Sequence, residues 1–165
     1  MAAKRLSLRE FQQGVIDRLQ AIGQVGERAT TLGVQIGETL WLVEMSDISE
    51  VLPIPALTEV PLTKRWFWGL ANVRGNLYSL VDMNDFLQEV ETVREGTSRA
   101  LLVAAKFGYS TGLVVSRVLG LRNSHEWRRV EQDGQVSFTD EQGQVWRKLD
   151  MTGLLGRPDF LQIEN

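Results

Sequence analysis

The stretch that decides the fold of this chain is WGLANVRGNLYSLVD, residues 68–82. Two apolar runs, Gly69 to Val73 and Leu77 to Val81, predict two strands because each is short and bounded by turn residues. The tripeptide RGN separates them. We predict a three-residue hairpin loop in which Gly75 or Asn76 takes the positive φ that such a loop needs.

Short apolar runs separated by Gly, Pro and Asn recur over most of the chain and predict an all-β protein. Further strands are expected at residues 32–36, 39–43, 48–52, 100–105, 112–119, 136–138 and 145–149. The runs at 101–105 and 113–115 are continuously apolar, which indicates strands covered on both faces. A single open sheet does not cover both faces, whereas two barrels or sheets that share buried strands do.

The N-terminal segment has a different pattern. Ser7 to Glu10 match the S-x-x-E capping box, and apolar residues follow at steps of three and four, which predicts a helix over residues 7–22. This helix either packs on its own domain or docks on a partner. We therefore divide the chain into a helical extension, residues 1–28, and a main domain, residues 29–165.

Two polar segments interrupt the predicted strands. Residues 88–99 are the expected connection between two β-rich halves, 32–82 and 100–155. Residues 122–144 are expected to form long loops with one short strand. Asp82, followed by Asn84 and Asp85, predicts the cap of a short helix that ends near Leu87.

Composition restricts the class of protein. The chain has 165 residues, 43% hydrophobic and 24% charged, with a net charge of −3, which argues against a general nucleic-acid binder. It has no cysteine and a single histidine, His125, which excludes thiol chemistry and Cys/His zinc sites. No apolar window reaches the length of a membrane span, so we expect a soluble, intracellular protein.

No motif predicts catalysis, a metal or a cofactor. The acidic run from Asp82 to Asp85 lacks the Gly and Glu of an EF-hand loop, and His125 beside Glu126 has no patterned nucleophile. One alternative comes from Lys64, Arg65, Trp66, Phe67 and Trp68, because cations next to aromatic rings can stack single-stranded bases on a barrel. A binding or scaffold module is favoured over an enzyme, with a single-stranded nucleic-acid-binding β-barrel as the alternative.

Three segments carry a resemblance to a known family. Residues 69–75 with 80–83 read GLANVRG and LVDM, residues 112–121 read GLVVSRVLGL, and residues 149–155 read LDMTGLL. Together they resemble the CheW family of chemosensory coupling proteins over about residues 30–156. The Ala-Asn version of the motif and the N-terminal helix are most similar to the coupling proteins of the type IV pilus (twitching motility) system, the PilI type.

The resemblance implies two five-stranded β-barrels that share a hydrophobic core. It also implies a non-catalytic adaptor that joins the cytoplasmic tip of a chemoreceptor to the regulatory domain of a CheA-like histidine kinase. Such a protein is cytoplasmic and is recruited to membrane-associated receptor arrays. No cofactor, metal, nucleic acid or membrane insertion is implied.

The resemblance also implies site residues. Arg74, in the turn, would pair with Glu50, and the receptor groove would map to Ile48, Gly69, Arg74, Gly112, Val118 and Leu121. From the residues alone, Arg74 could equally be an exposed turn cation, and Gly112 and Val118 could be plain strand and core positions. Ser116 stands where the family usually has aspartate, and Ser79 where it often has proline.

Overall fold

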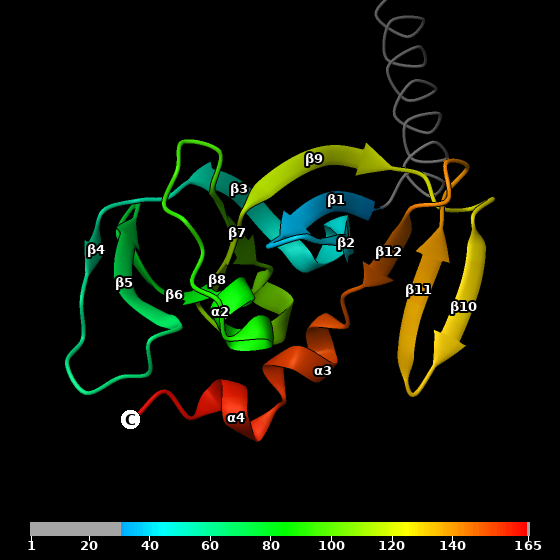
Figure 1. The fold of residues 1–165 in the computed structure, drawn as a ribbon. Coiled ribbons are helices and arrows are strands. Elements are labelled where there is room, and N and C mark those ends of the chain that lie inside the picture. The colour runs from blue at the N-terminus through cyan, green and yellow to red at the C-terminus, as the bar shows by residue number, and fades with distance from the viewer. Residues whose placement is uncertain (1–30, 165) are drawn as a thin grey trace, which may run out of the picture.

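A computed structural model describes residues 31–164, which fold into two six-stranded sheets (Figure 1). Sheet A has the order β10 (Arg128–Gln132), β11 (Gln135–Thr139), β12 (Val145–Lys148), β2 (Thr39–Glu44), β1 (Thr31–Ile36), β9 (Arg117–Arg122). Sheet B has the order β3 (Ile48–Pro53), β7 (Arg99–Val103), β8 (Thr111–Val115), β6 (Asn76–Asp82), β5 (Phe67–Val73), β4 (Leu57–Thr58). The predicted all-β class is confirmed. The helix predicted at 7–22 lies outside the described residues.

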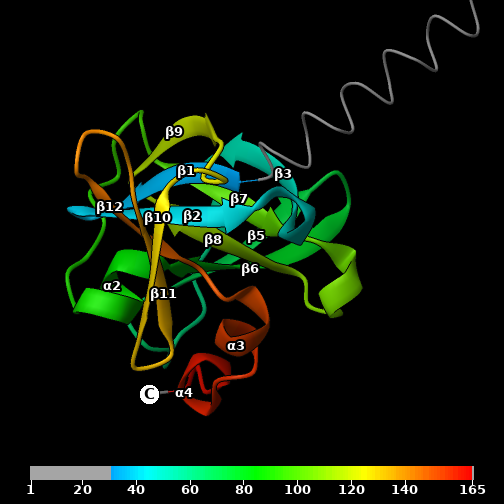
Figure 2. The same ribbon diagram turned by 90° about the vertical axis from the view of Figure 1, so that its right-hand side faces the viewer.

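The helices of the described part are short. Helix α2 (Met83–Gln88) follows β6 and begins at Asp82, whose side chain accepts hydrogen bonds from the backbone N–H groups of Asn84 and Asp85. The prediction of a capped helix after the motif is therefore confirmed. Helices α3 (Met151–Leu155) and α4 (Pro158–Leu161), which lie below the sheets in Figures 1 and 2, were not predicted.

The turn between β5 and β6 is tighter than predicted. Val73 pairs with Asn76, so the loop has two residues. The positive φ predicted for Gly75 or Asn76 is found on Gly75 (85°), and Arg74 has one as well (51°). Two consecutive residues of this conformation make the hairpin turn whose twist matches that of the strands. The Asn72 side chain accepts a hydrogen bond of 2.8 Å from the Gly75 N–H and holds the turn.

Other predictions need correction. The single strand predicted at 112–119 is two strands, β8 and β9, separated at Ser116. Residues 122–144 contain a hairpin, β10–β11, instead of loops with one strand. Residues 88–99 join β6 to β7 of the same sheet, so they do not divide the chain into two halves; sheet B is instead inserted whole between β2 and β9.

Strands β7 and β8 of sheet B are buried on both faces, as the continuous apolar runs predicted. Leu101 and Leu113 face a large core shared with sheet A, whereas Ala100 and Val114, their neighbours in sequence, face a second core. The second core lies inside the curled sheet B and contains Trp68, Ala71 and Leu80. Alternate residues of the same strands therefore serve two hydrophobic cores.

In the described residues no helix is both long enough and apolar enough to cross a membrane. Each hydrogen-bonded sheet has six strands in the described residues, and the two sheets share a hydrophobic core, as the resemblance implied.

Gly69 gives a test of this packing. Its φ is +128°, and a Cβ there would lie 2.3 Å from the backbone oxygen of Thr58 in β4. We expect Gly69→Ala to lower the free energy of unfolding by more than the ~1–3 kcal/mol of backbone strain alone, because a backbone atom must also move. Urea unfolding of the purified protein measures this change.

Two other glycines serve as controls. Gly75 has φ +85° with open space around it, and Gly96 has neither positive φ nor close neighbours. Gly75→Ala should show strain only, and Gly96→Ala should be close to neutral. Equal effects at Gly69 and Gly96 would contradict the close approach of β4 to β5.

Candidate functional site

Arg74 and Glu50 form an ion pair between the β5–β6 turn and strand β3. The arginine side chain is 69% exposed and the glutamate 33%. Three strands, β7, β8 and β6, stand between β3 and β5 in the sheet, a span of about 19 Å if the sheet were flat. The pair can form only because sheet B curls, and it ties the two sides of the curled sheet together at its rim.

Two of the predicted groove residues are part of the interior. Gly69, Leu80, Gly112, Leu102 and Glu50 are consecutive partners across five strands of sheet B. A Cβ on Gly112 would lie 2.4 Å from Cδ2 of Leu80, and that on Gly69 would meet β4. The space in the Cβ direction of each glycine is thus already filled by this chain.

The remaining predicted residues lie on edge strands. Ile48 begins β3 and is buried in the shared core, Val118 of β9 is half-buried against the same core, and Leu121 of β9 is 57% exposed. Strands β3 and β9 are the edges of sheets B and A, and both run along the upper side of the molecule in Figures 1 and 2. Val51 of β3, which the sequence did not single out, adds a 37% exposed apolar side chain to this side.

Asp82, the last residue of the opening motif, is fully buried. Besides the two N–H groups of α2, its carboxylate accepts hydrogen bonds from the N–H and the hydroxyl of Thr92. Burial raises the pKa of Asp82, and the bonds from Thr92 oppose that rise. The carboxylate therefore fixes the loop after α2 to the end of β6. Thr92 could not be predicted as its partner, because the threonine lies in a polar segment with no motif.

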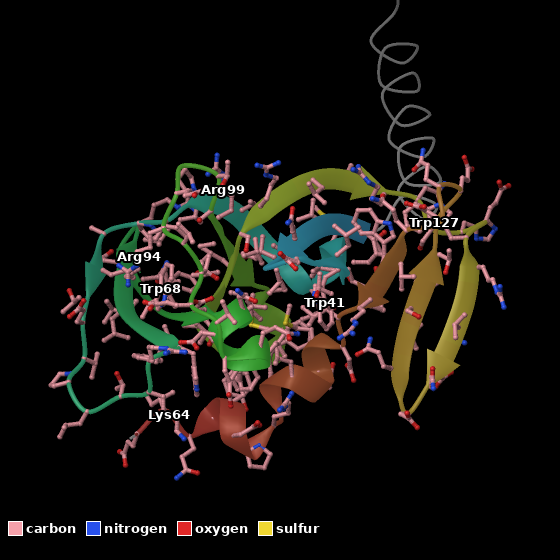
Figure 3. The ribbon with its side chains drawn as sticks, viewed as in Figure 1. Trp41, Lys64, Trp68, Arg94, Arg99 and Trp127 are labelled. Atoms are coloured by element: carbon pink, nitrogen blue, oxygen red, sulfur yellow. The ribbon has the colours of Figure 1, made fainter. Side chains whose placement is uncertain are left out.

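The basic and aromatic cluster considered for nucleic-acid binding is used by the fold. Phe67 and Trp68 are buried, and Trp66 packs against Phe86 and Phe160 with ring centroids 5.2 and 6.1 Å apart. The guanidinium of Arg94 covers the Trp68 ring at 4.1 Å (Figure 3), and Lys64 lines the same surface hollow as this pair. Arg65 is bound to the buried carboxylate of Asp85, which raises the pKa of the arginine. No row of open rings remains in this cluster for bases to stack on.

The single histidine lies in an exposed loop. His125 lines an open hollow of about 480 Å³ with Asn123, Glu126, Trp127 and Glu141. Within residues 31–164, no group of three or more His, Cys, Asp or Glu side chains is placed to hold a metal ion. The hollow has carboxylates and an imidazole but no arrangement of nucleophile, base and orienting group, so it offers no chemistry that we can assign.

The two departures from the family motif have structural roles. The Ser116 hydroxyl accepts a 2.9 Å hydrogen bond from the N–H of Gly37, the turn residue between β1 and β2. The N–H of Ser79 donates a 2.9 Å bond to the carbonyl of Ser110, which a proline there could not do. Serine at both positions is therefore compatible with the same strand connections.

The structure is a β-sheet scaffold domain: two sheets share a core, and the Arg74–Glu50 ion pair lies at the rim of one of them. Its exposed features are strand edges and turns. Residues 30–159 match the model of the CheW-like domain, so the chain belongs to the CheW-like family. The resemblance read from the motifs is thereby confirmed.

Individual relatives agree with this assignment. The chain is 33% identical over 93 residues to protein PilI of Pseudomonas aeruginosa, covering 56% of this chain and 51% of that protein. It is 32% identical over 88 residues to protein FrzA of Myxococcus xanthus, covering 53% and 54%. The aligned regions thus span about half the length of these curated relatives.

Among solved structures, the scaffolding protein TtCheW from Thermoanaerobacter tengcongensis superposes with a TM-score of 0.70 at 16% identity. The match covers 82% of this chain and 97% of that one. At this identity the likeness establishes the fold.

Thr92→Val tests the role of Asp82. The variant keeps the shape of the side chain but removes the hydroxyl donor, so at pH 7 we expect a loss of about 1–3 kcal/mol in the free energy of unfolding. The folded-state pKa of Asp82 is already above its ordinary 3.8 and should rise further in the variant. An Asp whose pKa is higher in the folded state binds its proton more tightly there than in the unfolded state. Its contribution to the free energy of unfolding is therefore greatest at low pH and is lost as the pH rises through the folded-state pKa.

The deficit of the Thr92→Val variant relative to the wild type should therefore widen as the pH rises from about 4 to 7. Chemical denaturation at several pH values measures it, with Thr97→Val as the control, because Thr97 is exposed in the same loop. A deficit that does not change with pH would mean that the Thr92 hydroxyl does not act on the charge of Asp82.

Proposed function

We propose that this chain is a non-catalytic adaptor that couples a chemoreceptor to a CheA-like histidine kinase. The observation that carries the proposal is the CheW-like match over residues 30–159, together with a fold of that kind. The receptor partner would be the cytoplasmic tip, a long helical hairpin, and the kinase partner its regulatory domain. The protein would act in the cytoplasm, at membrane-associated receptor arrays.

The Arg74–Glu50 pair is the proposed polar anchor of the receptor surface. Its arginine is exposed at the end of a rigid two-residue turn, and its carboxylate comes from an edge strand of the same sheet. A guanidinium presents several donors in a fixed plane, so it can keep Glu50 and still donate to a partner. Val118 and Leu121, with the newly noted Val51, would supply the apolar side of a surface for an amphipathic helix, and Ile48 would support Val118 from the shared core.

The output that we propose is type IV pilus twitching motility. It rests on the identity to protein PilI and on the Ala-Asn form of the motif, Ala71-Asn72. Protein FrzA is a second relative at similar identity, so the particular pathway has to come from the partners.

Affinity capture from a lysate of the native bacterium tests the proposal. With the tagged full chain as bait, we expect mass spectrometry to recover a histidine kinase and a methyl-accepting receptor together. Their genomic neighbourhood would then identify the output. Recovery of nucleic acid or of unrelated enzymes, with neither partner, would contradict the adaptor function.

Arg74→Ala tests the proposed anchor. We expect binding of the recovered receptor to weaken about ten-fold, which corresponds to roughly 1.4 kcal/mol. The free energy of unfolding should change by less than about 1 kcal/mol, because the pair is solvent-exposed and the turn keeps a non-glycine residue.

The matched control is Arg157→Ala, which removes an exposed arginine from an exposed pair with Asp159 elsewhere on the surface. Titration calorimetry of the wild type and both variants gives the comparison. Equal affinities for the receptor would remove Arg74 from the site, and unfolding of Arg74→Ala would make the residue structural.

A further inference from the structure

Within residues 31–164, no strand pairs with the outer edge of β10. All five residues of the strand, Arg128 to Gln132, are exposed. In the described part of the chain β10 pairs only with β11, and it is the last strand of sheet A. Figure 2 shows the β10–β11 hairpin at the front of the molecule, with no described segment before it.

The other three edges of the two sheets carry features that discourage pairing with another chain. β4 has only two residues, β3 has a register shift and contains Pro53, and the β1–β9 ladder has a register shift next to Gly120, which has positive φ. Short edges, prolines and bulges are the usual protections of sheet edges. β10 has five residues, no proline and a ladder with β11 that is unbroken over five pairs, so its charged side chains are the one such protection that it carries.

The hairpin turn determines which backbone groups of β10 are free. Asp133 and Gly134, with φ of 53° and 77°, form a two-residue loop, so Gln132 and Gln135 are the hydrogen-bonded pair that flanks it. Backbone groups alternate sides along a strand, so Gln132, Val130 and Arg128 bond to β11. The N–H and C=O groups of Arg129 and Glu131 therefore point outward and are available to a partner strand.

The sequence of β10, RRVEQ, is complementary to itself in the antiparallel direction. With Val130 opposite Val130 of a second copy, Arg129 faces the other Glu131 and Glu131 faces the other Arg129. Both free residues of each strand then pair, and each pair exchanges two hydrogen bonds and joins opposite charges. A slide of one residue would place the outward-pointing residues of one strand against inward-pointing residues of the other, and a slide of two residues would place Arg129 against Arg129 or Glu131 against Glu131.

We propose that this chain self-associates through antiparallel pairing of β10 with β10 of a second copy, centred on Val130. The contact is isologous, so it closes at two copies and joins the two A sheets into one. Arg129 and Glu131 already bond each other within the strand, at 3.1 Å and both more than half exposed, and they exchange these bonds for the same bonds across the interface. The paired edge is small, so the dimer is weak in dilute solution.

Cross-linking tests the register. The chain has no cysteine, so Val130→Cys introduces a single thiol. At a non-hydrogen-bonded position the two Cα atoms would lie about 4.5 Å apart, which a disulfide can span. Mild oxidation of the full-length variant should give a covalent dimer.

Gln132→Cys is the matched control, because it places a thiol on the same exposed strand. The two thiols of that dimer would be offset by four residues, roughly 14 Å, which a disulfide cannot span. Cross-linking of both variants at equal rates would show random collision and overturn the proposal, as would no cross-linking of Val130→Cys.

Charge reversal tests the interface without a covalent bond. Sedimentation velocity of the full chain up to millimolar concentration should show a monomer–dimer equilibrium. Arg129→Glu alone and Glu131→Arg alone should each weaken it about ten-fold, because two attractive pairs become repulsive. Both changes together in one chain, or the two single variants mixed in equal amounts, should restore it.

A wild-type protein that remains monomeric over the whole range, or a double variant that does not recover, would overturn the pairing. The outcome is independent of the adaptor function, since β10 is in a different sheet from β3 and at the opposite end of sheet A from β9, and the assay contains no receptor or kinase.

Discussion

Strands β7 and β8 have no solvent-facing side, and this double burial governs the rest of the structure. Leu101 and Leu113 belong to the core shared with sheet A, and Ala100 and Val114 belong to the core inside sheet B. A core can lie inside one sheet only if that sheet curls, and curling crowds its concave face. Small residues there relieve the crowding, which explains why a Cβ on Gly112 would be 2.4 Å from Leu80.

Local signals were sufficient for most of the strands and for the capped helix. Continuous apolar runs predicted strands with two covered faces, and Asp82 predicted the start of α2, because both depend on neighbouring residues alone. The β10–β11 hairpin was missed because β10 is exposed on both faces and has no apolar alternation. Its Asp133-Gly134 dipeptide was the available signal, since it is a favoured hairpin turn.

Helices α3 and α4 and the break at Ser116 were missed for another reason. With five and four residues, the helices are too short to show a helical period, and the clearest sign of α3 is the Asp150 cap. Ser116 separates two apolar runs that read as one strand, yet its hydroxyl accepts a hydrogen bond from Gly37 in a different hairpin. Such a partner follows from the tertiary fold and not from the local sequence.

The candidate site shows the same division between local and long-range information. The turn itself follows from Arg74-Gly75, but three strands separate β5 from β3, so no spacing rule pairs Arg74 with Glu50; only the family resemblance suggested that pair. The resemblance also suggested Gly69 and Gly112 for a binding groove. The structure shows why glycine is needed at both positions within the domain itself: β4 approaches Gly69 closely, and Leu80 approaches Gly112 closely.

The two buried carboxylates of the described residues already have partners within the domain, so binding is left to the strand edges and turns. Asp82 accepts hydrogen bonds from Thr92 and from the first turn of α2, and Asp85 forms an ion pair with Arg65. The two surfaces that remain open are well placed to act together, because β9, which carries Leu121, and β10 are the opposite ends of the same sheet. A second copy paired on β10 adds its strands beyond that end and leaves the β9 end uncovered. Pairing of two copies would therefore double the number of receptor surfaces in one assembly without competing for either of them.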